Sequence, residues 1–523
     1  MIYRAPPISY DDVPYRSRSL PSTAPNHLAT LAALFGMRPA PATQCRVLEL
    51  GCAGGGNLIP LAYALPESSF VGIDLSAHQI AIGQTLVDEL GLGNIALEHG
   101  NILDIGAELG RFDYIIVYGI YSWVPREVQE KILAICKRHL ASNGVAFVSY
   151  NTYPGWHIRG IARDMMLYHS QHFETNDQRI SQARAVVDFM AEATAKLGAN
   201  DARIKLYSQL LEQEREQIHA QPDFYLAHEH LSEVNDPIYF AQFVERAAQH
   251  GLQYLSDARL STMLVGLLPA DIAETLEGIA PHSIAVEQFM DFLYNRTFRQ
   301  TLLCHDDVPL RRDLAPQQML GFQVASAARP VAPGEPEFSP TLEKFRTPSG
   351  SVISAKSPLS SAALRCLADR WPQALSFDDL LAAALARAGS PPEDAVAAER
   401  LADLVLTCYS TDVVELRVHT PPFVLEAGER PTASRLARLQ ARRDGVVTNL
   451  CHESVALDPA CEALMPYLDG QHNRAALRAV LEQLIAEGAL ELDPGDDLAH
   501  AAAVAELLKD SLQKLARGAL LLS

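Results

Sequence analysis

The sequence lacks most of the features that mark secreted, zinc-binding or membrane-spanning proteins. Its eight cysteines are scattered, with no Cys-x-x-Cys pair, so neither a disulfide framework nor a zinc site is expected. No apolar run reaches the roughly 18 residues of a membrane-spanning helix. The segment from Met1 to Pro7 does not join a basic region to an apolar stretch, which argues against a signal peptide. We therefore expect a cytoplasmic protein with reduced thiols and no membrane span.

Basic residues are also in short supply. Lys and Arg number 43 against 63 Asp and Glu, which gives a formal net charge of −20. Nucleic-acid affinity rests largely on Lys and Arg that neutralise phosphates, so we expect no nucleic-acid partner. The acidic excess fits a basic partner, or it is simply solvated surface. We find no tandem repeat of useful period either, which argues against a solenoid.

The 523 residues, 48% of them apolar, are enough for about three or four domains with buried cores. From Cys45 to about Tyr150, apolar strands alternate with helices. The strands are expected near residues 46–50, 70–74, 95–98, 113–118 and 144–150. This alternation predicts an α/β fold, with a parallel sheet covered by helices on both faces.

A glycine-rich turn follows the first of these strands. The stretch Val47 to Asn57 reads Val-Leu-Glu-Leu-Gly-Cys-Ala-Gly-Gly-Gly-Asn. Glycines let the backbone bend sharply and approach a ligand closely. The turn matches a Glu/Asp-x-Gly-x-Gly-x-Gly signature, except that alanine replaces the middle glycine. The candidate cofactor contacts here are Glu49, Gly51, Cys52, Ala53, Gly54 and Asn57.

Three further strand ends carry groups that suit a nucleoside. Asp74 closes the second strand, where its carboxylate can accept hydrogen bonds from ribose hydroxyls, and Leu75 follows it. The third strand runs into His99 to Asp104, where Asn101 and Ile102 could meet an adenine edge. The fourth strand opens at Tyr118 and Gly119. An ordinary glycine loop, or a nicotinamide or flavin site, accounts for these features less well than S-adenosylmethionine (SAM).

Aromatic and amide side chains on two loops form the candidate site for the molecule that would accept a methyl group from SAM. Ligands of open α/β sheets lie outside the carboxyl ends of the strands. Groups that hold an ammonium by hydrogen bonds and cation–π contacts suit a lysine acceptor. The candidates after the fourth strand are Tyr118, Tyr121, Ser122 and Trp123, and those after the fifth strand are Asn151, Tyr153 and Trp156. The Asn-x-Tyr-Pro stretch follows the fifth strand rather than the fourth, which disfavours adenine methylation.

Two other polar features stay open to interpretation. His228, Glu229 and His230 follow Pro222; on a strand, the two histidines would share a face, but no further metal ligands are evident, so no metal site is predicted. Hydrogen bonding near the strands that close the sheet is the favoured role. Near the N-terminus, Pro14 and Tyr15 belong either to a lid over the nucleoside site or to a tail packed on the surface.

The rest of the chain reads as helical insertions and accessory modules. A strand after residue 222, a helix over 237–250 and a strand after Gly251 would close the sheet, followed by helix over 263–306. Protruding amphipathic helices commonly pack against a second copy, which predicts a homodimer. The expected segments are an N-terminal lid and lead-in helix (1–44), the first part of the SAM-binding domain (45–170), a dimerisation insertion (171–221), completion of the catalytic fold with regulatory helices (222–306), a linker with short strands (307–357), a winged-helix-like domain (358–425) and a C-terminal helical domain (426–523).

Several stretches together resemble bacterial class I methyltransferases that carry a methyltransferase regulatory domain, a group that includes the rickettsial-type protein lysine methyltransferases. The resemblance implies SAM as methyl donor, a helical dimerisation insertion and, in the best-understood members, transfer to lysines of bacterial surface proteins. The winged-helix-like tail is similar in arrangement only. The stretches are 9–15, 50–57, 118–125, 150–156, 228–235 and 295–303.

Three functions remain in view. The first is a protein lysine methyltransferase, because a large accessory region suits a macromolecular acceptor. The second is a small-molecule methyltransferase of a biosynthetic pathway. The third is a SAM-binding regulator with weak activity.

Overall fold

A seven-stranded sheet forms the centre of the computed structural model, which describes residues 11, 13, 15–339, 341–389, 391, 396–491 and 497–523. The strand order is β3-β2-β1-β4-β5-β7-β6, and β7 alone runs antiparallel to its neighbours. This arrangement confirms the predicted fold class. The strands are β1 (Arg46–Leu50), β2 (Ser69–Asp74), β3 (Ile95–His99), β4 (Phe112–Val117), β5 (Leu140–Asn151), β6 (Leu252–Asp257) and β7 (Phe298–His305).

Side chains alternate across β1 and divide the core into two layers. Val47 packs with the apolar residues of α1 (Pro25–Leu34) and α2 (Leu58–Ala64) on one face. Leu48 and Leu50 pack with α4 (Arg126–His139) on the other face. The third helix of the parallel part, α3 (Ala77–Leu90), connects β2 to β3. Because both faces are covered, the carboxyl ends of the strands form the accessible edge.

The closing strands differ from the prediction in two places. Residues 226–230 form a short π-helix (Leu226–His230) after α8 (Asp223–Tyr225), where we expected a strand. Residues 298–305 form β7, where we expected a helix. The helices of this stretch, α10 (Ala270–Ile279) and α11 (Ser283–Tyr294), end before that strand begins. The polar residues Arg299 and Thr301 are buried in β7, so its apolar alternation is not visible in the sequence. The helix α9 (Phe240–Gln249) precedes β6 as predicted.

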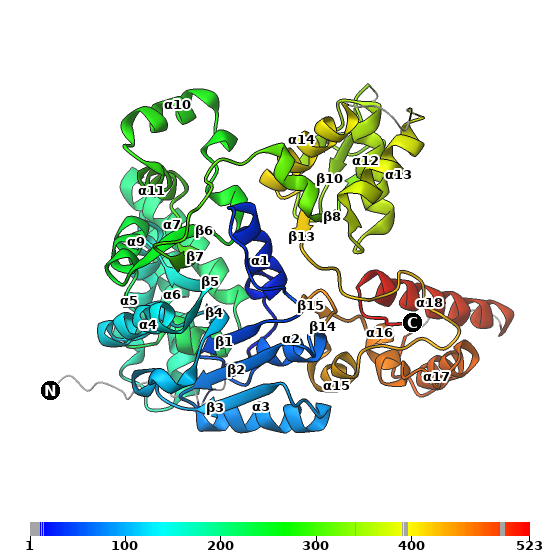
Figure 1. Cartoon of the computed structure of the whole chain (residues 1–523). Helices are drawn as coiled ribbons and strands as arrows, with labels where there is room; N and C mark the ends of the chain where they lie inside the picture. The colour runs from blue at the N-terminus through cyan, green and yellow to red at the C-terminus, as the bar shows by residue number, and fades with distance from the viewer. Residues whose placement is uncertain are drawn as a thin grey trace.

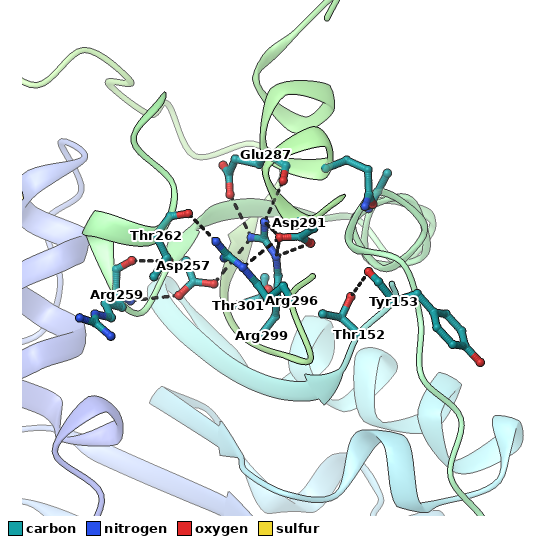
Figure 2. A network of polar contacts seen from close by, with 12 residues as sticks. Thr152, Tyr153, Asp257, Arg259, Thr262, Glu287, Asp291, Arg296, Arg299 and Thr301 are labelled. Atoms are coloured by element: carbon teal, nitrogen blue, oxygen red, sulfur yellow. Dashed lines mark hydrogen bonds and ion pairs between the residues drawn. The ribbon is translucent and has the colours of Figure 1, made fainter. Parts of the chain in front are cut away.

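A buried ion network attaches α11 to the sheet (Figure 2). The guanidinium of Arg299 on β7 contacts Asp291 at 2.8 Å and Glu287 at 2.9 Å, both from α11, and lies 3.6 Å from Asp257 on β6. Its Cζ sits 3.7 Å from the ring centroid of Phe240. The network thereby attaches α11 to β6 and β7.

Three helices between β5 and the π-helix make up the helical insertion and its base. They are α5 (Gly155–Ser170), α6 (Asn176–Leu197) and α7 (Ala202–Ala220). Ala183, Val187 and Ala191 of α6 are buried, whereas large apolar side chains on the outer surface are exposed. Those exposed side chains include Phe189 at 65%, Leu197 at 64% and Leu206 at 61%.

Two further lobes follow the catalytic part (Figure 1). The first contains a small sheet, β12-β8-β13, and a second one, β11-β10-β9. Its elements are β8 (Gln323–Ala325), β9 (Arg329–Pro330), β10 (Lys344–Arg346), β11 (Val352–Ser354), α12 (Pro358–Arg370), β12 (Leu375–Ser376), α13 (Phe377–Ala388), α14 (Ala397–Ser410) and β13 (Glu415–Arg417). The C-terminal lobe contains α15 (Arg435–Asp444), β14 (Val446–Thr448), β15 (Ser454–Ala456), α16 (Pro459–Leu464), α17 (Arg474–Ala486) and α18 (Asp497–Arg517).

Within the described ranges, none of the helices combines the length and the apolar character that crossing a lipid bilayer requires.

Candidate active site

The glycine turn after β1 bends through three left-handed residues, of which Gly55 has φ +71°. Gly51 has φ +72°, and Ala53, which replaces the middle glycine of the signature, has φ +48°. The Ala53 N–H donates to Oδ2 of Asp74 at 2.7 Å. This bond ties the turn to the end of β2 and compensates for the unusual backbone of an alanine. The turn therefore keeps the conformation of the signature without that glycine.

Asp74 occupies the position that the sequence predicted for a ribose-binding carboxylate. Its Oδ1 accepts from Ser76 N–H at 2.8 Å, so both oxygens are oriented by backbone donors. Desolvation raises the pKa of this carboxyl group. Next to it, Leu75 exposes 70% of its surface, a value that suits an apolar contact with a flat ligand. Asn101 caps the next turn through Leu103 N–H at 3.0 Å, with Ile102 half-buried beside it.

Two residues predicted as cofactor contacts face the protein interior. Asn57 is 4% exposed, and protein groups bind both ends of its amide: Leu20 N–H donates to Oδ1 at 3.0 Å, and Nδ2 donates to Oε1 of Glu49 at 3.2 Å. Asn57 thus supports the turn from behind and does not point into the crevice. Cys52 is 2% exposed, and burial raises the pKa of its thiol, so its side chain is a small apolar spacer beneath the turn.

Glu49 keeps one oxygen for a ligand. Burial raises the pKa of its carboxyl group to about 8, and the Asn57 bond opposes that rise. Oε1 is bound by Asn57, whereas Oε2 is buried with no hydrogen-bond partner among the described residues. A buried oxygen without a donor is costly, and the amino group of a bound amino-acid moiety would satisfy it.

The N-terminal segment passes directly over the turn. Gly56 N–H donates to Oγ of Ser17 at 3.0 Å, and a Cβ on Gly56 would lie only 2.1 Å from the Ser17 carbonyl oxygen. Tyr15 accepts from Gln79 Nε2 at 2.9 Å through its carbonyl, and its ring packs edge-on against Phe224 at 5.3 Å. The described part of this segment is therefore packed against both sides of the crevice. Pro14 lies outside the described residues.

The loop after β4 carries one accessible tyrosine and one core tyrosine. Tyr118 is half-buried, with Phe298 of β7 edge-on at 6.3 Å. Gly119 has φ +69°, and a Cβ there would meet open space, which places an opening above the end of β4. Tyr121, by contrast, is fully buried against Phe243 at 5.2 Å. Its predicted place in the acceptor site is not what this structure shows.

Two tryptophans meet where the segments after β4 and β5 come together. Trp123 and Trp156 meet edge-to-face at 5.9 Å, and Nε1 of Trp156 is buried without a hydrogen-bond partner in the described chain. Asn151 Nδ2 donates to Oδ1 of Asn235 at 2.9 Å, and Asn151 N–H donates to Oγ of Ser122 at 2.9 Å. The bond to Ser122 joins the end of β5 to the loop after β4, and the bond to Asn235 joins it to the segment that follows the π-helix.

Tyr153 lies at the outer rim of this region. Its ring stacks on His157 at 4.2 Å and tilts against Tyr239 at 5.3 Å. Figure 2 shows the ring pointing away from the buried Arg299 network. Tyr239 in turn contacts Phe292 of α11, which is 48% exposed. An accessible aromatic band therefore extends from the β5 loop to the regulatory helices.

The π-helix separates the two histidines that the strand interpretation placed on one face. His228 Nε2 bonds to the carbonyl oxygen of Val13 at 2.6 Å and so holds the N-terminal segment. His230 is buried near Tyr225 at 6.1 Å, and desolvation lowers its pKa to about 3, which keeps the ring neutral. The structural hydrogen-bonding role that the sequence favoured fits His228. The expectation that the two histidines share one face of a strand was wrong, because the segment is a π-helix.

Glu229, between the histidines, is the group that the sequence left without a role. Burial raises the pKa of its carboxyl group to about 7. Desolvation is the largest cause that raises the pKa of the phenols of Tyr118 and Tyr225, and the charge of Glu229 raises both pKa values further. The only sequence signal for this cluster was the His-Glu-His run itself, because a five-residue π-helix has no recognisable periodicity.

The crevice suits SAM better than a metal. A carboxylate at the end of β2, an exposed apolar neighbour and an unsatisfied buried carboxylate oxygen match its ribose, adenine and amino group respectively. Across the described ranges, no three His, Cys, Asp or Glu side chains gather closely enough to hold a metal ion.

The sheet order and this crevice define a class I methyltransferase, and comparisons with known proteins agree. Family models match at residues 47–144 (methyltransferase domain), 222–305 (predicted methyltransferase regulatory domain) and 429–520 (PKMT, C-terminal winged helix domain). The winged-helix match lies beyond the 358–425 range for which the sequence suggested such a module, within the C-terminal lobe.

Similarity also extends over nearly the whole chain. Uncharacterized protein RP789 of Rickettsia prowazekii is 35% identical over 493 residues, which cover 92% of this chain and 87% of the relative. The structure of PKMT2 from Rickettsia typhi in complex with AdoHcy is similar with a TM-score of 0.86 and 30% identity, covering 98% of this chain and 100% of that one. Uncharacterized protein RP028 of R. prowazekii is 37% identical over 255 residues, 49% of this chain and all of that protein.

The chain belongs to the family of class I SAM-dependent methyltransferases with a methyltransferase regulatory domain, to which PKMT2 from R. typhi is related. It is a SAM-dependent methyltransferase, as the strand ends predicted. SAM supplies an electrophilic methyl group on a sulfonium.

Proposed function

We propose that the enzyme methylates amines, and that its acceptors are lysine side chains of proteins. The feature that carries this proposal is the half-buried Glu229 of the π-helix, whose charge raises the pKa of the phenols of Tyr118, at the end of β4, and Tyr225. A carboxylate with two phenols is a suitable environment for an ammonium group.

A lysine must lose a proton before its nitrogen can attack a methyl carbon. The ordinary pKa of a lysine side chain is about 10.4, so at neutral pH the enzyme has to bind the protonated ammonium form and then remove a proton from it to give the neutral amine. Glu229, with a pKa of about 7, can accept the proton, and the phenol oxygens can hold the nitrogen in line. The nitrogen lone pair then forms the N–C bond as the C–S bond breaks, and AdoHcy leaves.

The accessible rim supports a polypeptide acceptor over a small molecule. Phe292, which is 48% exposed, continues the aromatic band that runs from Tyr153 through Tyr239, and Phe298, which is 37% exposed, lies edge-on to Tyr118. A small-molecule site would bury most of its ligand in a closed pocket. An exposed aromatic band instead offers contact to the residues that flank a lysine.

We also propose a homodimer through the helical insertion. Phe189 and Leu197 of α6 and Leu206 of α7 are each more than 60% exposed, and helices that present large apolar side chains to solvent commonly pack against a second copy. We propose that this helical insertion is the dimerisation unit. Sedimentation of the full-length chain, with Phe189→Glu and Leu206→Glu introduced together, would test it: monomers are expected only for the variant.

Mass spectrometry after incubation with isotopically labelled SAM tests the acceptor class. The enzyme is added to a bacterial lysate, and both the tryptic peptides and the low-mass fraction are searched for label. Label on lysine peptides is the expected result. Label confined to the low-mass fraction would favour a small-molecule methyltransferase, and SAM binding without transfer would favour a regulator; either would overturn the proposal.

A further inference from the structure

A histidine from the C-terminal lobe reaches the back of the SAM-binding turn. Nε2 of His452 lies 2.8 Å from Oδ1 of Asn57, although the two residues are 395 positions apart in the sequence. Both side chains are buried, at 6% and 4% exposure. Figure 1 shows the β14–β15 hairpin that carries His452 beside α2, which Asn57 precedes.

The direction of this hydrogen bond follows from its neighbours. Leu20 N–H can only donate, and it donates to Oδ1 of Asn57, which fixes that atom as the acceptor. His452 must therefore donate its Nε2–H. Burial lowers the pKa of His452 to about 3, so the ring is neutral and the bond persists across physiological pH.

The hairpin turn is built to present this side chain. His452 has φ +65°, a left-handed conformation that histidine adopts uncommonly. Asn449 holds the turn, since its Oδ1 accepts from the backbone N–H groups of Cys451 at 3.0 Å and Glu453 at 2.8 Å. Its Nδ2 donates to the carbonyl oxygen of Gly518, which anchors the turn to the end of the lobe.

The contact continues from Asn57 to the cofactor groups. With Oδ1 occupied, Nδ2 of Asn57 donates to Oε1 of Glu49, whose other oxygen is the unsatisfied one. The same hairpin also holds the N-terminal segment: Oγ of Ser454 lies 2.9 Å from Oγ of Ser19, two residues after the serine that binds Gly56. The C-terminal lobe therefore supports the glycine turn in two ways: through His452 and Asn57, and through Ser454 and the N-terminal segment.

We propose that the C-terminal lobe is part of the SAM site, with His452 as a positioning residue that holds Asn57, and through it Glu49, in the geometry that binds the cofactor. Undocking of this lobe lowers the affinity for SAM. Substrate or partner contacts to the lobe can thus alter cofactor binding without touching the crevice. The inference rests on the SAM-dependent activity and is independent of the acceptor.

Calorimetry of SAM binding to full-length variants tests this proposal. His452→Phe keeps the volume but loses the donor from the C-terminal lobe, which leaves Asn57 Oδ1 with the Leu20 N–H and the Thr23 hydroxyl as its donors, and we expect the Kd for SAM to rise about tenfold. His452→Gln keeps a donor at a similar reach and should stay within about twofold of the wild type. Arg443→Ala removes an exposed ion pair to Glu89, 3.2 Å long, between the same lobe and α3, and should leave the Kd unchanged.

Amide hydrogen exchange of the wild-type protein gives a second measurement that needs no variant. Addition of AdoHcy should slow exchange in residues 449–455 as well as in the glycine turn. Unchanged affinity in His452→Phe, an equal loss in His452→Gln, or a hairpin whose exchange ignores AdoHcy would each overturn the proposal. If His452→Phe does not fold, His452→Gln and the exchange experiment decide.

Discussion

Arg299 and Asp291 form a two-pronged ion pair in the interior of the protein, with Nε 2.9 Å from Oδ2 and Nη2 2.8 Å from Oδ1. Asp291 is fully buried and Arg299 is 1% exposed. Both residues lie in the region matched by the regulatory-domain model, and the pair joins α11 to β7, which is itself a strand of the central sheet. The regulatory region is therefore built into the catalytic fold.

Arg299→Met should destabilise the protein strongly. The substitution leaves the buried carboxyl groups of Glu287 and Asp257 without their cation and leaves Asp291 with Arg296 alone, 3.1 Å away, and breaking a buried ion pair costs about 3–5 kcal/mol. Arg478→Ala is the matched control, because its pair with Glu482 is exposed and should change stability by less than about 1 kcal/mol. Urea denaturation followed by circular dichroism measures both. Equal stability of the two variants would show that the network is not needed for the fold.

Asp74→Ala should abolish measurable SAM binding. The carboxylate is the predicted ribose ligand, and it also orients the turn through Ala53 N–H. Calorimetry gives the affinity, and circular dichroism establishes that the fold survives. Retained affinity in a folded variant would mean that the ribose lies elsewhere.

Tyr118→Phe should slow turnover while the Kd for SAM stays near the wild-type value. The hydroxyl is proposed to hold the acceptor nitrogen, so its loss affects kcat; removing one positioned hydrogen-bonding group typically costs tenfold or more, about 1.4 kcal/mol. Tyr121→Phe, three residues further on, changes a side chain buried in the core and should keep its kcat. Single-turnover kinetics with an unmethylated lysine peptide as the acceptor separates the two variants, and equal rates would remove Tyr118 from the acceptor site.

Glu229→Gln should change the pH dependence of the reaction as well as its rate. The carboxyl group titrates at about pH 7, and only its ionised form accepts a proton, so the wild-type kcat/KM should rise as the pH increases through 7. Glutamine cannot titrate, so the variant should lose this limb of the profile. A variant that keeps the same rise would assign the titration to another group.

The sequence predicted the structure best where a residue type has a single structural role. The five parallel strands, the glycine turn and Asp74 were predicted closely, because apolar runs and glycines report directly on buried strands and tight backbone. Ala53 departed from the signature, and only the structure explains it, through the bond to Asp74.

Long-range contacts could not be predicted in this way. β7 was missed because Arg299 sits where an apolar residue was expected, and its charge is compensated by residues 8 to 42 positions away. Asn57 appeared to be a ligand because it ends the glycine turn, yet its amide is occupied by Leu20, Glu49 and His452. Tyr121 looked equivalent to Tyr118, but the short helical turn at 121–123 directs it into the core.

A crystal structure with SAM or AdoHcy and a lysine-containing peptide tests the central claim most directly. We predict that the side-chain nitrogen of the lysine lies between the hydroxyl of Tyr118 and the carboxyl group of Glu229, in line with the sulfur of the cofactor. A cofactor whose sulfur faces away from these two residues, or a lysine bound elsewhere, would contradict the account.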